Sequence, residues 1–324
     1  MGRLSRLSLG VWCEHWTPKE VSKHLGWLKD RDLRLHLAVK ADALASDFTP
    51  IWKEARALGL ETWAWPLLSE EQGYWPNAIN AEAFSHRVRE LLEEWSSGGA
   101  LPIGVSFDFE PPLERLREDL GRLRGWGAAF MLPALFAERR RKRHDTSIRA
   151  AASPFRALVD HLRSLGLGVH AVTTPLVLAD LERDSWSVRQ ALGLPLESEL
   201  YDWVSFMAYR SEYENFLGYL GSALVRDTAQ RARQCLGGRA SVDVGVVGDI
   251  SFPHRIEGMK GARDLEQELS GAAQAGVSRI QIYRLEGIRA LGLEPSPTPG
   301  EQGGMAILPR IKIWVMNALV RWVF

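Results

Sequence analysis

The chain has 324 residues, of which 46% are hydrophobic and 13 are tryptophan, enough for one large α/β domain or two small ones. Its 40 basic and 40 acidic residues cancel, which argues against a nucleic-acid partner held by a global positive field. The two cysteines, Cys13 and Cys235, lie far apart without a partner spacing, so we expect neither a disulfide framework nor a zinc site.

The N-terminal segment, residues 1–12, carries positive charge but lacks the continuous apolar stretch of a signal peptide. No uninterrupted apolar run reaches the roughly 18 residues that a membrane span needs. A cytoplasmic location is therefore the default expectation.

Short apolar runs alternate with amphipathic helical patterns from one end of the chain to the other. Several runs are entered through a glycine that suits the end of a helix, as at Gly59 and Gly166. Eight such repeats with near-continuous apolar strands favour a (β/α)8 TIM barrel over an open doubly wound sheet. The predicted strands are residues 7–14, 33–41, 60–68, 102–110, 167–175, 201–209, 240–248 and 278–286; the helical patterns include residues 18–30, 81–95, 154–166 and 262–276.

Motifs that bind cofactors or metals are absent from the sequence. The turn after the first strand, 10-GVWCEHW-16, has no glycine-rich loop for a dinucleotide. No H-E-x-x-H, G-x-S-x-G or G-x-x-x-x-G-K motif occurs, which argues against zinc proteases, α/β-hydrolases and P-loop enzymes. We expect no cofactor and no metal.

The chain divides by composition into a barrel over residues 1–293, a Pro/Gly-rich linker over 294–304 and a hydrophobic, basic segment over 305–324. A long connection or insertion after the fourth strand, roughly 113–153, contains the basic run 139–144. The C-terminal segment is amphipathic, with Arg310, Asn317 and Arg321 on one narrow face of a helical wheel and Lys312 interrupting the apolar side. It either packs on the barrel or contacts a membrane surface or a partner protein, together with the basic run, which otherwise is a solvated loop.

The stretch 104-GVSFDFEPP-112 carries the chemistry. Alternate residues of a strand face opposite sides, so directing Val105, Phe107 and Phe109 to the outer helices directs Ser106, Asp108 and Glu110 into the barrel. Two prolines end the strand, which places the acids at the carboxyl-terminal rim, where barrel active sites are built.

Burying two acids side by side is costly and separates their pKa values, so that one stays ionised while the other keeps a proton. Glu110, nearer the mouth, is the better candidate for the protonated member, acting as general acid on a leaving-group oxygen. The alternative is that arginines or lysines of the barrel hold Asp108 and Glu110 in a scaffold salt-bridge network.

A second strand, 203-WVSFMAYR-210, directs Ser205, Met207 and Tyr209 inward and also ends at the rim. With "SFDFE" about 100 residues before "FMAYR", the chain resembles glycoside hydrolase family 18, the chitinase-like barrels. In that family the fourth strand ends in D-x-D-x-E and the sixth reads M-x-Y-D. The resemblance covers roughly residues 7–290.

The resemblance implies three catalytic roles. Glu110 matches the acid that becomes a base in the second step, and Asp108 matches the residue that orients and stabilises the 2-acetamido group of the sugar. Tyr209 matches the tyrosine that hydrogen-bonds the acetamido oxygen, which is itself the nucleophile of that family's retaining mechanism. The spacing of Asp108 and Glu110 agrees, because two side chains leaving one strand in parallel cannot flank opposite faces of a sugar ring.

Three positions depart from the family pattern. Ser106 replaces the inner aspartate that would support Asp108, Arg210 replaces the aspartate after Tyr209, and Tyr283 stands in the eighth strand where a tryptophan floor is usual. A cationic Arg210 would suit a carboxylate or phosphate on the ligand.

Other polar and aromatic residues at strand ends are weaker candidates for substrate binding. Glu286 raises a separate hypothesis: facing Glu110 across the mouth at roughly 5–5.5 Å, it would make an ordinary two-carboxylate retaining glycosidase. Asp243, in the middle of the seventh strand, is interpreted as structural. The remaining candidates for substrate binding are Glu14, Trp16, Trp75 and Arg284.

The sequence therefore predicts a hydrolase acting on O-glycosyl bonds of a carbohydrate substrate, with Glu110 as general acid/base and Asp108 and Tyr209 positioning a 2-acetamido or similar group. One alternative is a catalytically inactive barrel that binds a glycan as a lectin does. Another is a barrel enzyme acting on an acidic or phosphorylated sugar, with Arg210 and Arg284 holding the anion.

Overall fold

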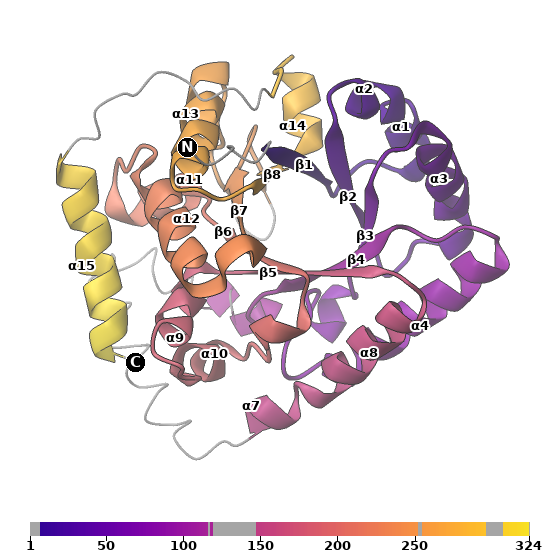
Figure 1. The fold of residues 1–324 in the computed structure, drawn as a ribbon, viewed down its shortest axis with the longest axis horizontal. Coiled ribbons are helices and arrows are strands. Elements are labelled where there is room, and N and C mark those ends of the chain that lie inside the picture. The colour runs from indigo at the N-terminus through magenta and orange to yellow at the C-terminus, as the bar shows by residue number, and fades with distance from the viewer. Residues whose placement is uncertain (1–6, 116, 119–146, 252–254, 296–306, 324) are drawn as a thin grey trace.

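The computed structural model describes residues 7–115, 117–118, 147–251, 255–295 and 307–323. Eight strands, each parallel to its neighbours, follow one another in chain order and close from β8 back to β1. The fold is a (β/α)8 barrel (Figure 1). All eight predicted strands are present: β1 Ser8–Cys13, β2 Leu33–Val39, β3 Thr62–Pro66, β4 Gly104–Phe109, β5 Gly168–Thr173, β6 Trp203–Met207, β7 Ala240–Gly245 and β8 Arg279–Tyr283.

Helices surround the strands (Figure 1). The pattern over 18–30 forms two short helices in place of one, and the predicted glycine ends hold at Gly59 and Gly166, whose φ angles are 64° and 73°. The helices are α1 Pro18–Ser22, α2 Leu25–Asp30, α3 Ala45–Leu58, α4 Ala81–Ser97, α7 Ser147–Ala150, α8 Ser153–Ser164, α9 Leu178–Leu181, α10 Ser187–Leu192, α11 Arg210–Leu217, α12 Ala223–Leu236, α13 Ala262–Gln274, α14 Leu285–Ala290 and α15 Ile307–Val323. Short 3₁₀ turns lie at Glu70–Gln72, Pro175–Val177, Ser198–Leu200 and Gly237–Arg239.

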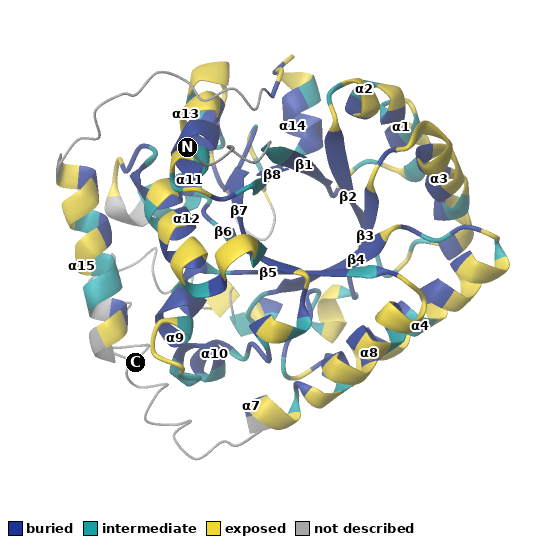
Figure 2. Cartoon of the chain, in the orientation of Figure 1, coloured by how far each residue is buried: buried dark blue, intermediate teal, exposed yellow. Residues whose placement is uncertain are grey.

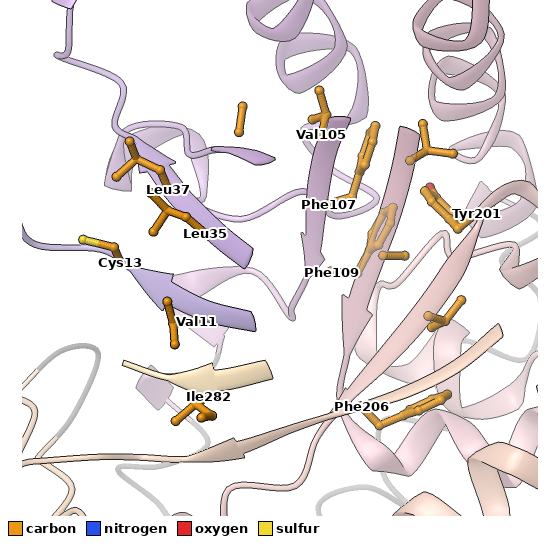
Figure 3. Close-up of a cluster of buried hydrophobic side chains, with 14 of the residues drawn as sticks. Val11, Cys13, Leu35, Leu37, Val105, Phe107, Phe109, Tyr201, Phe206 and Ile282 are labelled. Carbon is orange, nitrogen blue, oxygen red and sulfur yellow. The ribbon is translucent and has the colours of Figure 1, made fainter. Parts of the chain in front are cut away.

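The main core lies between the strands and the helices. Val105, Phe107 and Phe109 leave the same side of β4 and pack in this layer, where the Phe109 ring lies 5.0 Å from that of Phe155 on α8 (Figure 3). The strands are almost wholly buried, whereas the helices expose their outer sides (Figure 2). Because these residues face the outer helices, the alternate residues of each strand face the interior of the barrel.

Large rings fill the amino-terminal half of the barrel interior. The Trp63 ring occupies the space beside Gly104 and Gly168, where an added Cβ would lie 2.2 Å and 2.5 Å from the indole. Trp63 and Trp203 meet with ring centroids 4.5 Å apart, and the Arg34 guanidinium lies 5.6 Å from the Trp203 ring. The interior is therefore a packed core at this end, which leaves the carboxyl-terminal end for chemistry.

The C-terminal segment forms α15, which lies at the periphery of the barrel beside α12 and α9 (Figure 1). The basic run 139–144 and most of the predicted linker lie outside the described residues. In the part of the chain that the structure describes, no helix combines the length and apolar character needed to cross a membrane.

Candidate active site

Asp108 on β4 points into the barrel, and Glu110 directly follows the strand. Ser106, which shares the side of Asp108, hydrogen-bonds His36 on β2 and His170 on β5, whereas the alternate residues face the outer helices. Asp108 is buried, one of its carboxyl oxygens has no hydrogen-bond partner among the described residues, and Glu110 at the rim is half-buried. The inward direction predicted for Asp108 agrees with this burial, whereas the direction of the Glu110 side chain stays a prediction.

Burial and like charge act together on these carboxyls. Burial raises the pKa of Glu110 well above its ordinary value, and the negative charges of Asp108, Glu212 and Glu14 raise it further. Burial also raises the pKa of Asp108, with Asp243 and Glu14 adding to the effect. Among the described residues, the charges that act most strongly on the two carboxyls are negative, which gives no support to a scaffold of arginines or lysines. Burial and like charge both disfavour the ionised forms of these acids.

Asp243 on β7 is a member of the same cluster. It is fully buried, and its Oδ2 accepts a hydrogen bond of 3.1 Å from Nε1 of Trp12. Burial raises its pKa to about 7, against the lowering effect of Ser205 and Trp12. These contacts are compatible with the interpretation of Asp243 as structural, but its position beside the acids was not predicted. The strand's alternation carried the signal, because Val242 and Val244 face the outer core and so turn Asp243 inward.

A buried chain of hydrogen bonds runs across the barrel toward Asp243. Nδ1 of His36 lies 2.9 Å from Oγ of Ser106, which lies 3.1 Å from Nδ1 of His170, and Nε2 of His170 lies 3.1 Å from Oγ of Ser205. Burial lowers the pKa of both histidines well below the ordinary value, so both rings are neutral. The four side chains thus form one continuous chain of hydrogen bonds between neutral groups on β2, β4, β5 and β6.

Three tyrosines border the acids. Burial raises the pKa of Tyr209 well above its ordinary value, and the charges of Asp243 and Asp108 raise it further. The Tyr209 ring lies 5.6 Å from that of Tyr283. Glu14, at the end of β1, accepts hydrogen bonds from the hydroxyls of Tyr283 and Tyr74, the second at 2.8 Å. The structure thus brings Glu14, Tyr209 and Tyr283 to the mouth with the acids of β4.

A second apolar cluster includes several aromatic residues and contacts two of the candidate site residues. Half-buried Met207 and Tyr209 pack against it, and Trp75 is one of its buried members. Trp16 is not: its ring stacks on His24 at 4.5 Å and packs with the outer core. The buried members are Trp12, Ala38, Trp65, Leu67, Trp75, Leu113, Val172, Val246, Ile256 and Tyr283.

Glu286 does not face Glu110, which corrects the hypothesis of a second catalytic carboxylate there. Its Oε1 accepts hydrogen bonds from the backbone amides of Glu14 and His15, at 2.9 Å and 2.7 Å, and lies 3.5 Å from Sγ of Cys13. Cys13 belongs to the outer core, so the Glu286 carboxylate lies behind β1. Its role is to fix the end of β1, and with it the backbone of Glu14.

The guanidinium of Arg210 is paired with carboxylates of the protein. This corrects the expectation that Arg210 binds a carboxylate or phosphate on the ligand. It begins α11, its side chain is 7% exposed, and Nε lies 3.3 Å from Oε1 of buried Glu268 on α13. Asp264 and Glu214 lie 3.4 Å and 3.8 Å from the same guanidinium. Arg284 donates to the backbone carbonyl of Asp249 at 2.8 Å, and a contact between Arg284 and substrate stays a prediction.

Glu212 on α11 is a functional candidate that sequence reasoning missed. It is half-buried, burial raises its pKa to about 7, and its charge raises the pKa of Glu110. It lies in the first turn of a helix, where a glutamate is common, so its sequence position gave no signal. Among the described residues, no group of three or more His, Cys, Asp or Glu side chains is arranged to hold a metal ion.

No protein-family model matches the chain, and no curated protein matches its sequence. Solved structures do match it in fold. A family 1 β-glucosidase from Thermotoga maritima has a TM-score of 0.54 at 9% identity, covering 88% of this chain and 90% of that one. Active domain 2 of a Pyrococcus furiosus chitinase has a TM-score of 0.48 at 10% identity, covering 98% of each chain. An L-ribulose 3-epimerase has 0.45 at 9% identity, covering 97% and 95%. At these identities the likeness shows the barrel fold alone.

Proposed function

We propose that this barrel hydrolyses glycosidic bonds, with Glu110 as the general acid. The observation that supports the proposal is that Glu110 directly follows β4 and its buried Asp108, where burial and the negative charge of Asp108 raise the pKa of Glu110 well above its ordinary value. A protonated carboxyl at the rim can donate to a bond that enters the mouth, whereas an ordinary surface glutamate is ionised at neutral pH.

The protonated carboxyl proposed for Glu110 determines how protons are transferred in the reaction. Glu110 donates its proton to the glycosidic oxygen as the bond from that oxygen to the anomeric carbon breaks. Glu110 is then a carboxylate. In the second step it accepts a proton from the water whose oxygen attacks the anomeric carbon, as the bond from that carbon to the nucleophile of the first step breaks. This proton transfer restores the acid, so one group serves both steps.

The nucleophile of the first step is proposed to come from the substrate. Asp108 leaves β4 on the side predicted for Glu110, so it cannot attack the opposite face of the ring, and Glu286 lies behind β1. The resemblance to family 18 supplies the alternative, a 2-acetamido oxygen that closes on the anomeric carbon. In this proposal Asp108 and Tyr209 hold that group, and Asp243 takes the supporting role that Ser106 cannot fill.

The rest of the mouth suits a carbohydrate. Aromatic faces pack against the apolar faces of sugar rings, and Tyr209 and Tyr283 lie at the mouth, where the cluster around Trp75 is packed beside them. The pairing of Arg210 with three carboxylates speaks against an acidic or phosphorylated sugar held by that residue.

The test is a set of chromogenic glycosides with and without a 2-acetamido group, assayed with the wild type and with Glu110→Gln. The proposal predicts release from the 2-acetamido members only. It also predicts a loss of at least ~10²-fold in kcat in Glu110→Gln, with ligand affinity kept, which is the usual scale for a general acid. Glu90→Gln, an exposed change on α4, is the matched control and keeps the wild-type rate. Glycan binding without any turnover by the wild type would instead establish the lectin-like alternative.

A further inference from the structure

Helix α15 has one face fastened to the barrel. Ile313 and Val320, 2% and 8% exposed, are buried against the neighbouring helices. Nδ2 of Asn317 donates to Oδ2 of Asp227 at 2.9 Å, and a guanidinium nitrogen of Arg321 donates to Oε2 of Glu182 at 2.9 Å. These contacts fix the rotation of α15 about its axis, so the direction of its other face is set.

The opposite face of α15 is apolar and open. Leu308, Ile311, Trp314 and Val315 are 62%, 51%, 69% and 40% exposed. At about 100° per residue, all four positions fall on the half of the helix turned away from Ile313 and Val320. In Figure 2 the helix lies at the edge of the molecule beyond α12, with exposed positions along it. Four large apolar side chains in one stripe are more than the scattered exposure of an ordinary surface.

The charges of α15 indicate which kind of surface contacts its apolar face. The helix contains Arg310, Lys312 and Arg321 and no aspartate or glutamate. Arg310 and Arg321 lie along one border of the apolar face, and Lys312 lies along the other. A second copy of this chain meeting the face about a two-fold axis would bring cations toward cations, which disfavours self-association. A partner surface with an apolar layer beneath a negatively charged layer would contact both parts of this face. Its apolar layer would contact the apolar stripe, and its negative charges would contact the basic residues along the borders.

We propose that α15 docks the barrel on an anionic lipid surface, lying in the plane of the interface. Leu308, Ile311 and Val315 would enter the boundary of the acyl chains. Trp314 would lie at the level of the headgroups, and Arg310 and Lys312 would extend their charges to lipid phosphates. Among the described residues no helix, α15 included, combines the length and apolar character needed to cross a membrane. Because its inner face is bonded to α12 and to Glu182, the whole barrel follows the helix to the surface.

The test uses the full chain in flotation with phosphatidylcholine vesicles and with vesicles that also contain about 30% phosphatidylserine, a typical anionic fraction. The wild type is expected to float with the anionic vesicles only. Ile311→Ser with Trp314→Ser should lower the bound fraction by roughly tenfold or more, since two large apolar groups are lost from the interface. Arg310→Glu should lower it by roughly fivefold or more. Ile79→Ser removes a side chain that is 77% exposed elsewhere and should float as the wild type does.

Three results would overturn the proposal. The first is a wild type that stays out of the lipid fraction with both vesicles. The second is a doubly substituted chain that floats as the wild type does. The third is a wild-type dimer, measured by light scattering, that Ile311→Ser with Trp314→Ser converts to a monomer without any lipid dependence, since a second copy would then cover the face. All substituted positions are exposed, and matching thermal melts establish that the variants are folded.

Discussion

The indole Nε1 of Trp12 on β1 donates a 3.1 Å hydrogen bond to Oδ2 of Asp243 on β7, across the intervening strand β8. The other oxygen of Asp243 has no hydrogen-bond partner among the described residues. One oxygen is thus anchored in the barrel while the other stays free beside Asp108, whose pKa the charge of Asp243 raises. This arrangement makes Asp243 a group that both orders the interior and tunes the acids at the mouth.

Asp243→Asn should flatten the dependence of stability on pH. Burial raises the folded pKa of Asp243 from its ordinary value of 3.8 to about 7, so the folded state holds a proton that the unfolded state releases as the pH rises from about 4 to about 7. The free energy of unfolding therefore falls across that window, by up to roughly 4 kcal/mol for this one group. The asparagine amide of the variant does not titrate. Urea unfolding at pH 5 and pH 8 should show a smaller difference for the variant than for the wild type.

The exposed change Glu90→Gln is the control and should leave the difference between the two pH values as it is in the wild type. A stability of Asp243→Asn that still falls as steeply with rising pH would mean that Asp243 is ionised throughout the range.

Asp108→Asn should move the alkaline limb of the pH–rate profile. The rate falls as Glu110 loses its proton, and the charge of Asp108 is the largest electrostatic contribution raising the pKa of Glu110 after burial. Removing that charge lowers the pKa of Glu110, so the limb of kcat/KM moves to lower pH. Glu212→Gln should move it the same way by less, since its charge is the next contribution. A limb that stays in place or moves to higher pH in Asp108→Asn would separate Asp108 from the acid.

Arg210→Met should destabilise the fold. The substitution leaves Glu268, which is fully buried, without the cation 3.3 Å from its Oε1. Breaking a buried pair from one side costs about 3–5 kcal/mol, measured as the free energy of unfolding. Arg255→Met is the matched control, because its pair with Glu257 is 3.6 Å long and both side chains are about three-quarters exposed, so it should cost at most about 1 kcal/mol. Equal losses would mean that Arg210 is not a structural cation.

Gly104→Ala should destabilise the barrel from within. An added Cβ would lie 2.2 Å from the Trp63 ring and 2.6 Å from the backbone oxygen of Gly168, so neither neighbour can simply turn aside. The expected cost is about 1–3 kcal/mol in denaturant unfolding. Gly26→Ala on α2 meets nothing within 4 Å and should be neutral or stabilising. A Gly104→Ala protein as stable as the wild type would show that Trp63 does not fill this space.

The fold could be predicted because each strand is a short, mostly apolar run and each run is separated from the next by a helical period. Alternation along β4 also fixed the direction of Asp108, since three large apolar residues on the other side leave only one orientation that buries them. The eight strands and the direction of Asp108 therefore followed from local pattern.

The partners of charged residues could not be predicted in the same way. Arg210 is paired with Glu268, which lies on a helix 58 residues later, and the carboxylate of Glu286 returns to the amides after β1. Such pairings depend on how helices pack around the barrel, which no local period encodes. Asp243 could have been found, because its strand alternates as β4 does, but it has no second acid beside it to draw notice.

The most direct test of the central claim compares leaving groups in Glu110→Gln. A general acid matters most when the departing oxygen needs a proton, so the variant should lose at least ~10²-fold on a glycoside with an alkyl leaving group. It should lose far less on the matching dinitrophenyl glycoside, whose leaving group departs as a stable anion. Equal losses on the two substrates, or none on either, would contradict the assignment of Glu110 as the proton donor.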